Sequence, residues 1–258
     1  MSVPHSTDTF NQHAGIYELL IDWPRRLSVE EPFYRQVFQS VGVKRVLDVA
    51  CGTGHHAAMF HSWGLQVEGA DLSPGMIAEC RAQFGEPTGL RWVVRGFQEP
   101  VGSGEPFDAV LCVGNSLALA DDVATVERAV ANMLEALRPG GVVILGLLNL
   151  WSLVPGRTVW QKCKRVSYAG GDHVVLKSIH RCGNRAHISF VDLELGASTV
   201  SPRYDTAELL GLRAEDLLEC IHRHGGTEAH VYGSYRFEPY VPSQSGDLII
   251  TCRRNATI

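Results

Sequence analysis

The stretch VLDVACGTGHHA, residues 46–57, decides the fold of this chain. It joins an apolar segment that contains one acid, Asp48, to a turn built on Gly52 and Gly54, and then to residues that favour a helix. The apolar run predicts a buried strand, and the residues after the turn predict a helix from about 55 to 63. Glycines let a backbone approach a ligand closely, and a helix start presents free N–H groups. The stretch therefore predicts a ligand site at the end of a strand.

The same strand-and-helix rhythm continues to residue 149. Strands are predicted at residues 66–71, 90–97, 107–115 and 142–149, and helices at 74–84 and 121–137, the first of these capped by Ser73. Strands that alternate with helices predict a parallel sheet covered on both faces. The predicted fold class is α/β, a Rossmann-like doubly wound and mostly parallel sheet.

The pattern changes on either side of this core. Residues 13–41 are predicted to be helical with breaks at Pro24 and Pro32, and residues 166–195 alternate like an antiparallel hairpin. Residues 206–226 carry a helical pattern, and residues 246–254 end the chain as a strand. The predicted organisation is a helical lid segment at 1–41, a ligand-binding core at 42–149, an antiparallel lid insertion at 150–204, and a helix and strands at 205–258 that complete the core sheet.

Composition restricts the partners of the chain. The 258 residues carry a net charge of -5 and no tract of clustered Lys and Arg, which disfavours long nucleic acid. Seven cysteines without a Cys-x-x-Cys pair predict reduced cysteines, a cytoplasmic location and no metal site. No signal peptide or membrane-spanning run is predicted. The sequence is compatible with a homo-oligomer and does not determine one.

Two acids at strand ends restrict which ligand the site can bind. The run GTGHHA keeps the spacing of a dinucleotide loop, with Ala57 in the third small position, so an NAD site stays open. Asp48 before the loop would repel a pyrophosphate but could bind an ammonium, and Asp71 is placed to hold a ribose hydroxyl pair. A ligand with adenosine, an amino group and no phosphate satisfies both acids. S-adenosylmethionine is such a ligand.

The motifs VLDVACGTGHHA, VEGADLSPGMI, GFQ, FDAVLCVGNSLA and LRPGGVVIL resemble, in order and spacing, those of class I S-adenosylmethionine-dependent methyltransferases. A narrower resemblance links RVLDVACGTG, GNSLA, RPGG, AHISFVDLEL and YGSYRFEPY to the glycine N-methyltransferase group of small-molecule methyltransferases. The resemblance implies a cofactor site, with Gln98 standing where the family commonly has an acid and Arg26 or Arg25 pairing the cofactor carboxylate. The expected cofactor residues are Arg26, Asp48, Ala50, Gly52, Gly54, Asp71, Leu72, Met76, Gly96, Phe97, Gln98 and Val113.

The acceptor side depends on the ends of strands four and five. Asn115 can offer an acceptor and donors to the nucleophile, so it is the predicted catalytic residue. Where glycine N-methyltransferases have a carboxylate-binding Arg, this chain has Leu148, which indicates that glycine is not the acceptor. Leu148, Trp151 and Tyr204 are the expected substrate contacts, with an apolar or aromatic acceptor, although Lys177 or Arg157 could restore a positive charge from the lid.

The predicted function is methyl transfer to a nitrogen or oxygen of a small molecule. The sequence does not choose between the two atoms and does not name the acceptor. An NAD(P)-dependent oxidoreductase and a catalytically silent cofactor-binding module stay as alternatives. His55 and His56 have no partners at metal-ligand spacing, so no metal is expected.

Overall fold

The structure is a computed structural model that describes residues 20–102, 104–168, 170–196 and 199–256. The predicted helical pattern before residue 20 lies outside the described residues. The helices are α2 (Trp23–Val41), α3 (His55–Ser62), α4 (Pro74–Phe84), α5 (Val123–Ala136) and α6 (Ala214–Arg223), with short 3-10 turns η1 (Ser116–Leu119) and η2 (Leu150–Ser152). None of these helices combines the length and hydropathy that crossing a bilayer requires.

Strands in the described residues form two sheets. The larger has seven strands in the order β10-β11-β5-β4-β1-β2-β3, and the smaller has four in the order β6-β7-β8-β9. The first sheet uses β1 (Arg45–Asp48), β2 (Gln66–Asp71), β3 (Leu90–Val94), β4 (Phe107–Cys112), β5 (Leu137–Leu148), β10 (Gly226–Tyr232) and β11 (Asp247–Arg254); the second uses β6 (Thr158–Tyr168), β7 (Gly171–Cys182), β8 (Arg185–Leu195) and β9 (Val200–Leu210).

The larger sheet is parallel from β5 to β3 and antiparallel at its other edge. β1 pairs in parallel with both β2 and β4, so the order of the strands reverses between β1 and β4. β11 runs antiparallel between β5 and β10. This is the predicted doubly wound α/β sheet, and such sheets bind ligands at the carboxyl ends of the strands where the order reverses.

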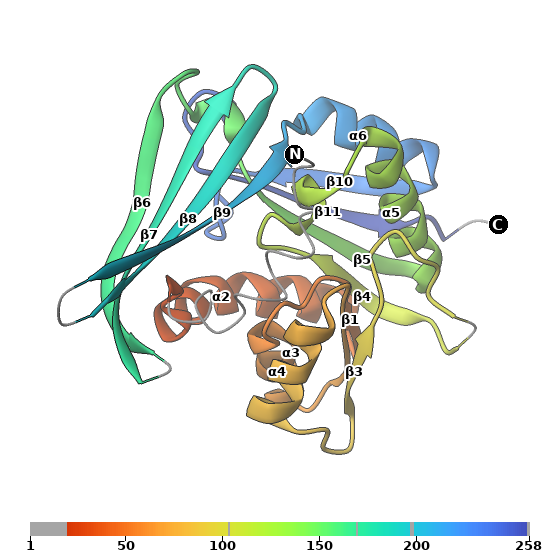
Figure 1. Ribbon diagram of the computed structural model, residues 1–258. Coiled ribbons are helices and arrows are strands. Elements are labelled where there is room, and N and C mark those ends of the chain that lie inside the picture. The colour runs from red at the N-terminus through yellow and green to blue at the C-terminus, as the bar shows by residue number, and fades with distance from the viewer. Residues whose placement is uncertain (1–19, 103, 169, 197–198, 257–258) are drawn as a thin grey trace.

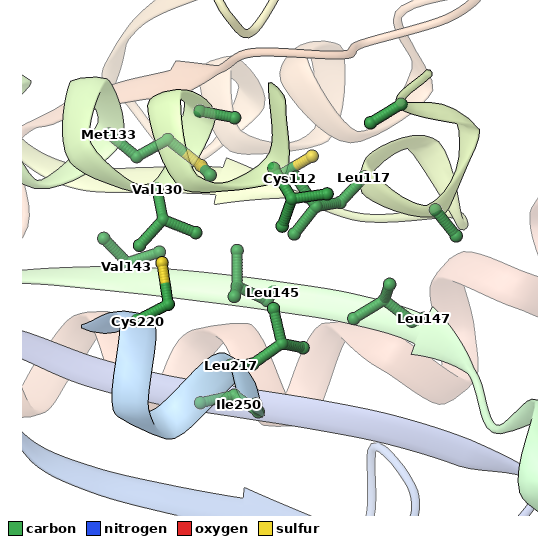
Figure 2. Close-up of a cluster of buried hydrophobic side chains, with 14 of the residues drawn as sticks. Cys112, Leu117, Val130, Met133, Val143, Leu145, Leu147, Leu217, Cys220 and Ile250 are labelled. Atoms are coloured by element: carbon green, nitrogen blue, oxygen red, sulfur yellow. The ribbon is translucent and has the colours of Figure 1, made fainter. Parts of the chain in front are cut away.

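Apolar packing holds the helices on this sheet. Figure 2 shows Val130 and Met133 of α5 and Leu217 of α6 packed against Val143 and Leu145 of β5, and all five side chains are buried. Close packing of this kind makes the sheet a rigid support for its loops. The strand ends that carry polar residues are therefore held in fixed positions.

The second sheet faces the α/β core, with α2 between them (Figure 1). It has more strands than the predicted hairpin, and it extends beyond the predicted insertion boundary at residue 204. The predicted helix at 206–226 is wrong in its first part, because β9 continues to Leu210 and α6 begins only at Ala214. Ala207 and Leu209 are buried and Glu208 between them is exposed, which is the alternation of a strand.

The predicted break at Pro32 is also wrong. Helix α2 starts at an N-cap, where the Asp22 carboxylate accepts from the Arg25 N–H at 3.2 Å, and it continues through Pro32 to Gly42, whose φ of 66° ends it. Phe33 and Tyr34, directly after the proline, are fully buried. Burial of two aromatic side chains outweighs the one backbone hydrogen bond that proline removes.

Candidate functional site

A cavity of about 160 Å³ lies at the carboxyl ends of β1, β2 and β4. Its walls come from segments that the sequence predicted to meet there, and also from α2 and the second sheet. The lining residues used below are Trp23, Arg26, Ala50, Gly52, Thr53, His56, Asp71, Leu72, Met76, Phe97, Val113, Gly114, Asn115, Lys177 and Phe190. We call this the cofactor cavity.

The glycine turn after β1 is fixed by Asp71. The Asp71 carboxylate accepts from the Gly52 N–H and from the Ser73 N–H, both at 2.9 Å. Gly52 and Gly54 have φ of 54° and 85°, and a Cβ on Gly54 would lie 2.7 Å from the Trp92 ring. A Cβ on Gly52 would meet nothing within 4 Å, so the turn leaves open space on its cavity side.

Two polar atoms beside the turn have no hydrogen-bond partner. The Asp48 side chain is 1% exposed, and its Oδ2 atom is unpartnered, as is the Oγ1 atom of the fully buried Thr53. Burial, with a smaller contribution from the charge of Asp71, raises the pKa of Asp48 to about 7. Burial also raises the pKa of Asp71. Thr53 lines the cavity, whereas Asp48 does not and lies just before the lining segment 49–53. Unpartnered buried polar atoms are costly, so a cationic, hydrogen-bonding ligand group beside this turn would stabilise it.

Part of the cavity lining is apolar. Leu72 follows β2, Met76 lies in the first turn of α4, and Phe97 follows β3. Ser73 caps α4, as predicted, by accepting from the Met76 N–H at 3.1 Å. Three apolar side chains from three segments make a slot for a flat ring such as a purine.

Two further residues expected in this part of the lining lie behind it. Gly96 and Gln98 do not line the cavity in the described part of the chain. The Gly96 N–H donates to the Glu99 carboxylate at 2.9 Å, and the Gln98 carboxamide folds back toward Gly96. Phe97 is the one residue of the three that reaches the cavity, because the chain turns after Val94.

Arg26 lies where the cofactor cavity opens toward the second sheet. Its guanidinium donates to the Glu30 carboxylate at 2.8 Å, and a Cβ on Gly114 would lie 3.6 Å from it. Glu30 also accepts from Tyr34 and is bonded to His56 at 2.7 Å. The structure therefore places Arg26 in the cofactor cavity, whereas Arg25 lines only the neighbouring chamber.

The two histidines serve packing and positioning. His55 stacks on Trp23 with ring centroids 4.2 Å apart, and His56 is buried against Glu30. Burial lowers the pKa of His56. In the described residues no group of three or more His, Cys, Asp or Glu side chains could hold a metal ion.

A second cavity of about 650 Å³ adjoins the first, and we call it the acceptor chamber. The two share Arg26, Gly114, Asn115, Lys177 and Phe190. The chamber also reaches the ends of β5 and β11 and the inner face of the second sheet. Its volume is within the range of about 300–1,000 Å³ that small-molecule pockets occupy.

Asn115 and Leu148 meet at the boundary of the two cavities. Asn115 has a left-handed backbone (φ 77°), and its side-chain oxygen accepts from the Leu148 N–H. The Asn115 side-chain oxygen, which was expected to accept a hydrogen bond from the nucleophile, is thus bonded to Leu148. The side-chain N–H groups of Asn115 stay available as donors to an acceptor molecule. Leu148 lines the chamber.

Asp247 is a chamber residue that the sequence argument missed. It lies opposite Leu148 in the register of β5 and β11. Burial, with a smaller contribution from the charge of Glu30, raises its pKa to about 6. In the sequence, Asp247 is recognisable only as an acid at the start of an apolar strand. Its position beside Leu148 follows from antiparallel pairing, which the sequence does not reveal.

Trp151 and Tyr204 do not line either cavity in the described structure. The Trp151 indole N–H donates to the Leu212 carbonyl at 3.1 Å, and its ring packs between Arg181 and Arg213. Tyr204 is 72% exposed on β9. The chamber that an apolar acceptor was expected to occupy is lined by apolar side chains such as Phe190 and also by Lys162, Lys164 and Lys177.

Known proteins share this arrangement. Residues 46–141 match a family described as a methyltransferase domain. A glycine/sarcosine N-methyltransferase of Aphanothece halophytica is 30% identical over 235 residues, which cover 85% of this chain and 80% of that protein. Another, from Parasynechococcus marenigrum, is 32% identical over 162 residues, covering 60% of this chain and only 56% of the relative's length.

Among solved structures, the sugar N-methyltransferase KedS8 from Streptoalloteichus is similar over nearly the whole chain. The superposition covers 99% of this chain and 95% of that one, with a TM-score of 0.75 and 25% identity. A match of this coverage includes the second sheet as well as the parallel sheet. The acceptor chamber between them is therefore built on an arrangement of elements that a known protein shares.

Proposed function

The chain belongs to the class I S-adenosylmethionine-dependent methyltransferases, and we propose that it methylates an amine nitrogen of a small-molecule acceptor larger than glycine. The observation that carries the proposal is that the cofactor cavity and the acceptor chamber share lining residues, among them Gly114, Asn115 and Lys177. A methyl donor in the first cavity and a nucleophile in the second would meet at this boundary.

The residues of the cofactor cavity fit S-adenosylmethionine. The unpartnered oxygens of Asp48 and Thr53 suit its amino end, the carboxylate of Asp71 suits ribose hydroxyls, and Arg26 suits its carboxylate. Leu72, Met76 and Phe97 suit the adenine ring. When bound, this cofactor supplies a methyl group that is already activated on a sulfonium.

The protein then has to align the acceptor and keep water out. Such alignment accounts for much of the rate in displacement reactions. The Asn115 N–H groups can hold an oxygen of the acceptor at the cavity boundary. The Asp247 carboxylate, with a pKa of about 6, can accept a hydrogen bond from the amine and take the proton that the methylated nitrogen releases.

The preference for nitrogen rests on two supports. The relatives and the solved structure described above are all named N-methyltransferases. A neutral amine needs only a proton acceptor such as Asp247, whereas a hydroxyl needs stronger activation. The chamber volume of about 650 Å³ supports an acceptor larger than glycine, and Leu148 offers no charge for a glycine carboxylate.

The test combines binding with turnover. Calorimetry should detect S-adenosylmethionine and not NADH, and methyl-labelled cofactor should transfer label to members of a panel of amines. Asp247→Asn should lower kcat/KM by about 100-fold and abolish its rise through pH 6, whereas the exposed Asp216→Asn should change neither. Binding of NADH alone would support the oxidoreductase alternative. Cofactor binding without transfer to any amine or phenol would support the silent module.

We also propose a cytoplasmic location for the enzyme. All seven cysteines are free thiols in the structure, which is the usage of a reducing compartment. A homo-oligomer remains a proposal from the sequence, and sedimentation of the purified chain would test it.

A further inference from the structure

Two lysines lie opposite each other on neighbouring strands of the second sheet, on the side that lines the acceptor chamber. Lys162 of β6 and Lys177 of β7 are paired in the strand register, and both line the chamber. Like charges directly opposite each other on neighbouring strands destabilise a sheet. Lys162 is exposed and Lys177 is half-buried, so their repulsion is partly screened by solvent, and an anion between the two ammonium groups would relieve what is left of it.

The surroundings of Lys177 disfavour its charged form. Burial, together with the positive charges of Arg26 and Lys162, lowers its pKa to about 8. Within the described residues no carboxylate forms an ion pair with Lys177. Its ammonium group lies over the Phe190 ring, 5.7 Å from the ring centre. A desolvated cation next to other cations is a site that an external anion would stabilise.

The acidic side chains that line the chamber either bond other residues or lie away from Lys177. Glu30 is bonded to Arg26, His56 and Tyr34, and Asp22 caps helix α2. The charges that shift the pKa of Asp247 are those of Glu30 and Arg26, and Lys177 is not among them. The chamber thus has a cationic end on the second sheet and an anionic end at β11.

We propose that Lys162 and Lys177 bind an oxyanion of the acceptor, a carboxylate or a phosphate, while its nucleophilic amine lies toward Asp247. The inference rests on the proposed function for the amine and assigns to the second sheet the anion recognition that Leu148 cannot supply. The acceptor is then a molecule that carries both a negative group and an amine, separated by the width of the chamber.

The first experiment measures anion binding without turnover. Inorganic phosphate and acetate are titrated into the full chain saturated with S-adenosylhomocysteine, and binding is followed by NMR of the lysine side chains. We expect saturable binding of at least one anion, weakened about tenfold by Lys177→Met or Lys162→Met and retained in Lys177→Arg. The exposed Lys44→Met should bind as the wild type does. Unchanged affinity for S-adenosylhomocysteine would show that each variant is folded.

Equal anion binding by all variants, or no saturable binding by the wild type, would overturn the proposal. The result is independent of methyl transfer, so it separates failure of this inference from failure of the proposed function. If S-adenosylhomocysteine does not bind, the proposed function fails and the anion titration is run on the free chain.

The second experiment identifies the source of the anion. Matched acceptors are compared, glucosamine 6-phosphate with glucosamine and 6-aminohexanoate with hexylamine, because in both charged members the anion lies several bonds away from the amine. Lys177→Met should raise KM for the phosphorylated or the carboxylated member about tenfold and leave kcat and the neutral partner unchanged. An equal rise for charged and neutral members would contradict anion recognition by these lysines.

Discussion

Asp48 should release a proton when the cofactor site is filled near neutral pH. Its pKa is about 7 in the free protein because the side chain is buried and lies near the charge of Asp71. An opposite charge within about 4–6 Å lowers the pKa of a carboxyl by about 1–3 units. The ammonium of S-adenosylhomocysteine, bound beside Asp48, would therefore leave the carboxylate fully charged.

The size of the effect follows from the pKa. A shift from about 7 to about 5 releases about 0.8 proton at pH 6, about 0.5 at pH 7 and about 0.1 at pH 8. The same linkage makes binding about tenfold weaker at pH 6 than at pH 8. In the free protein the raised pKa of Asp48 contributes stability to the folded state at a pH below 3.8, the ordinary pKa of the group. This contribution is lost as the pH rises through about 7.

Calorimetry of S-adenosylhomocysteine binding in phosphate and in Tris measures the released protons, because the two buffers have different heats of ionisation. Asp48→Asn keeps the shape of the side chain and removes its titration, so it should release fewer protons at pH 6 and bind with less dependence on pH. Asp71 also has a raised pKa, and only the difference between the variant and the wild type belongs to Asp48. Identical proton release in both proteins would refute the assignment of the ammonium to Asp48.

Three more predictions follow from the glycine turn and the second sheet. Asp71→Ala should weaken S-adenosylmethionine binding by about 1.5–3 kcal/mol, and an unchanged Kd in a folded variant would contradict the ribose contact. Gly54→Ala should lower the free energy of unfolding by about 1–3 kcal/mol, because its Cβ would lie 2.7 Å from the Trp92 ring. A Cβ on Gly52 meets nothing within 4 Å, so Gly52→Ala should lose less stability in thermal denaturation and more cofactor affinity. Amide hydrogen exchange in residues 158–210 should slow when S-adenosylhomocysteine and acceptor are both bound; equal rates with and without them would exclude a closing lid.

The sequence by itself determined the parallel core and the cofactor turn. Residues 46–57 hold strand, turn and helix start in one contiguous segment, and Asp71 with Ser73 repeats that arrangement at the next strand. These features depend on local backbone conformation and on apolar periodicity, both of which can be read along a single stretch of chain. Residues 46–141, which contain them, are also the part that matches the methyltransferase domain family.

Local pattern was insufficient where burial decides the conformation. The residues around Ala207 and Leu209 have a spacing that suits either a helix or a strand, and pairing with β8 selects the strand. In the same way Pro32 reads as a helix break, but the burial of Phe33 and Tyr34 holds α2 together. Trp151 follows a site strand directly in sequence, yet its stacking on two arginines keeps it out of the chamber.

Only the tertiary structure decided the acceptor side. Asp247 reaches the end of β5 because β11 pairs antiparallel with that strand, and Lys177 reaches the same chamber because the second sheet faces the core across α2. Each contact joins segments that are distant in the sequence, and no local signal specifies their register. The pKa values of both groups arise from the same packing, since burial is the largest cause of each shift. The cofactor turn was therefore determined by local sequence, and the charges that line the acceptor chamber were determined by how the two sheets pack together.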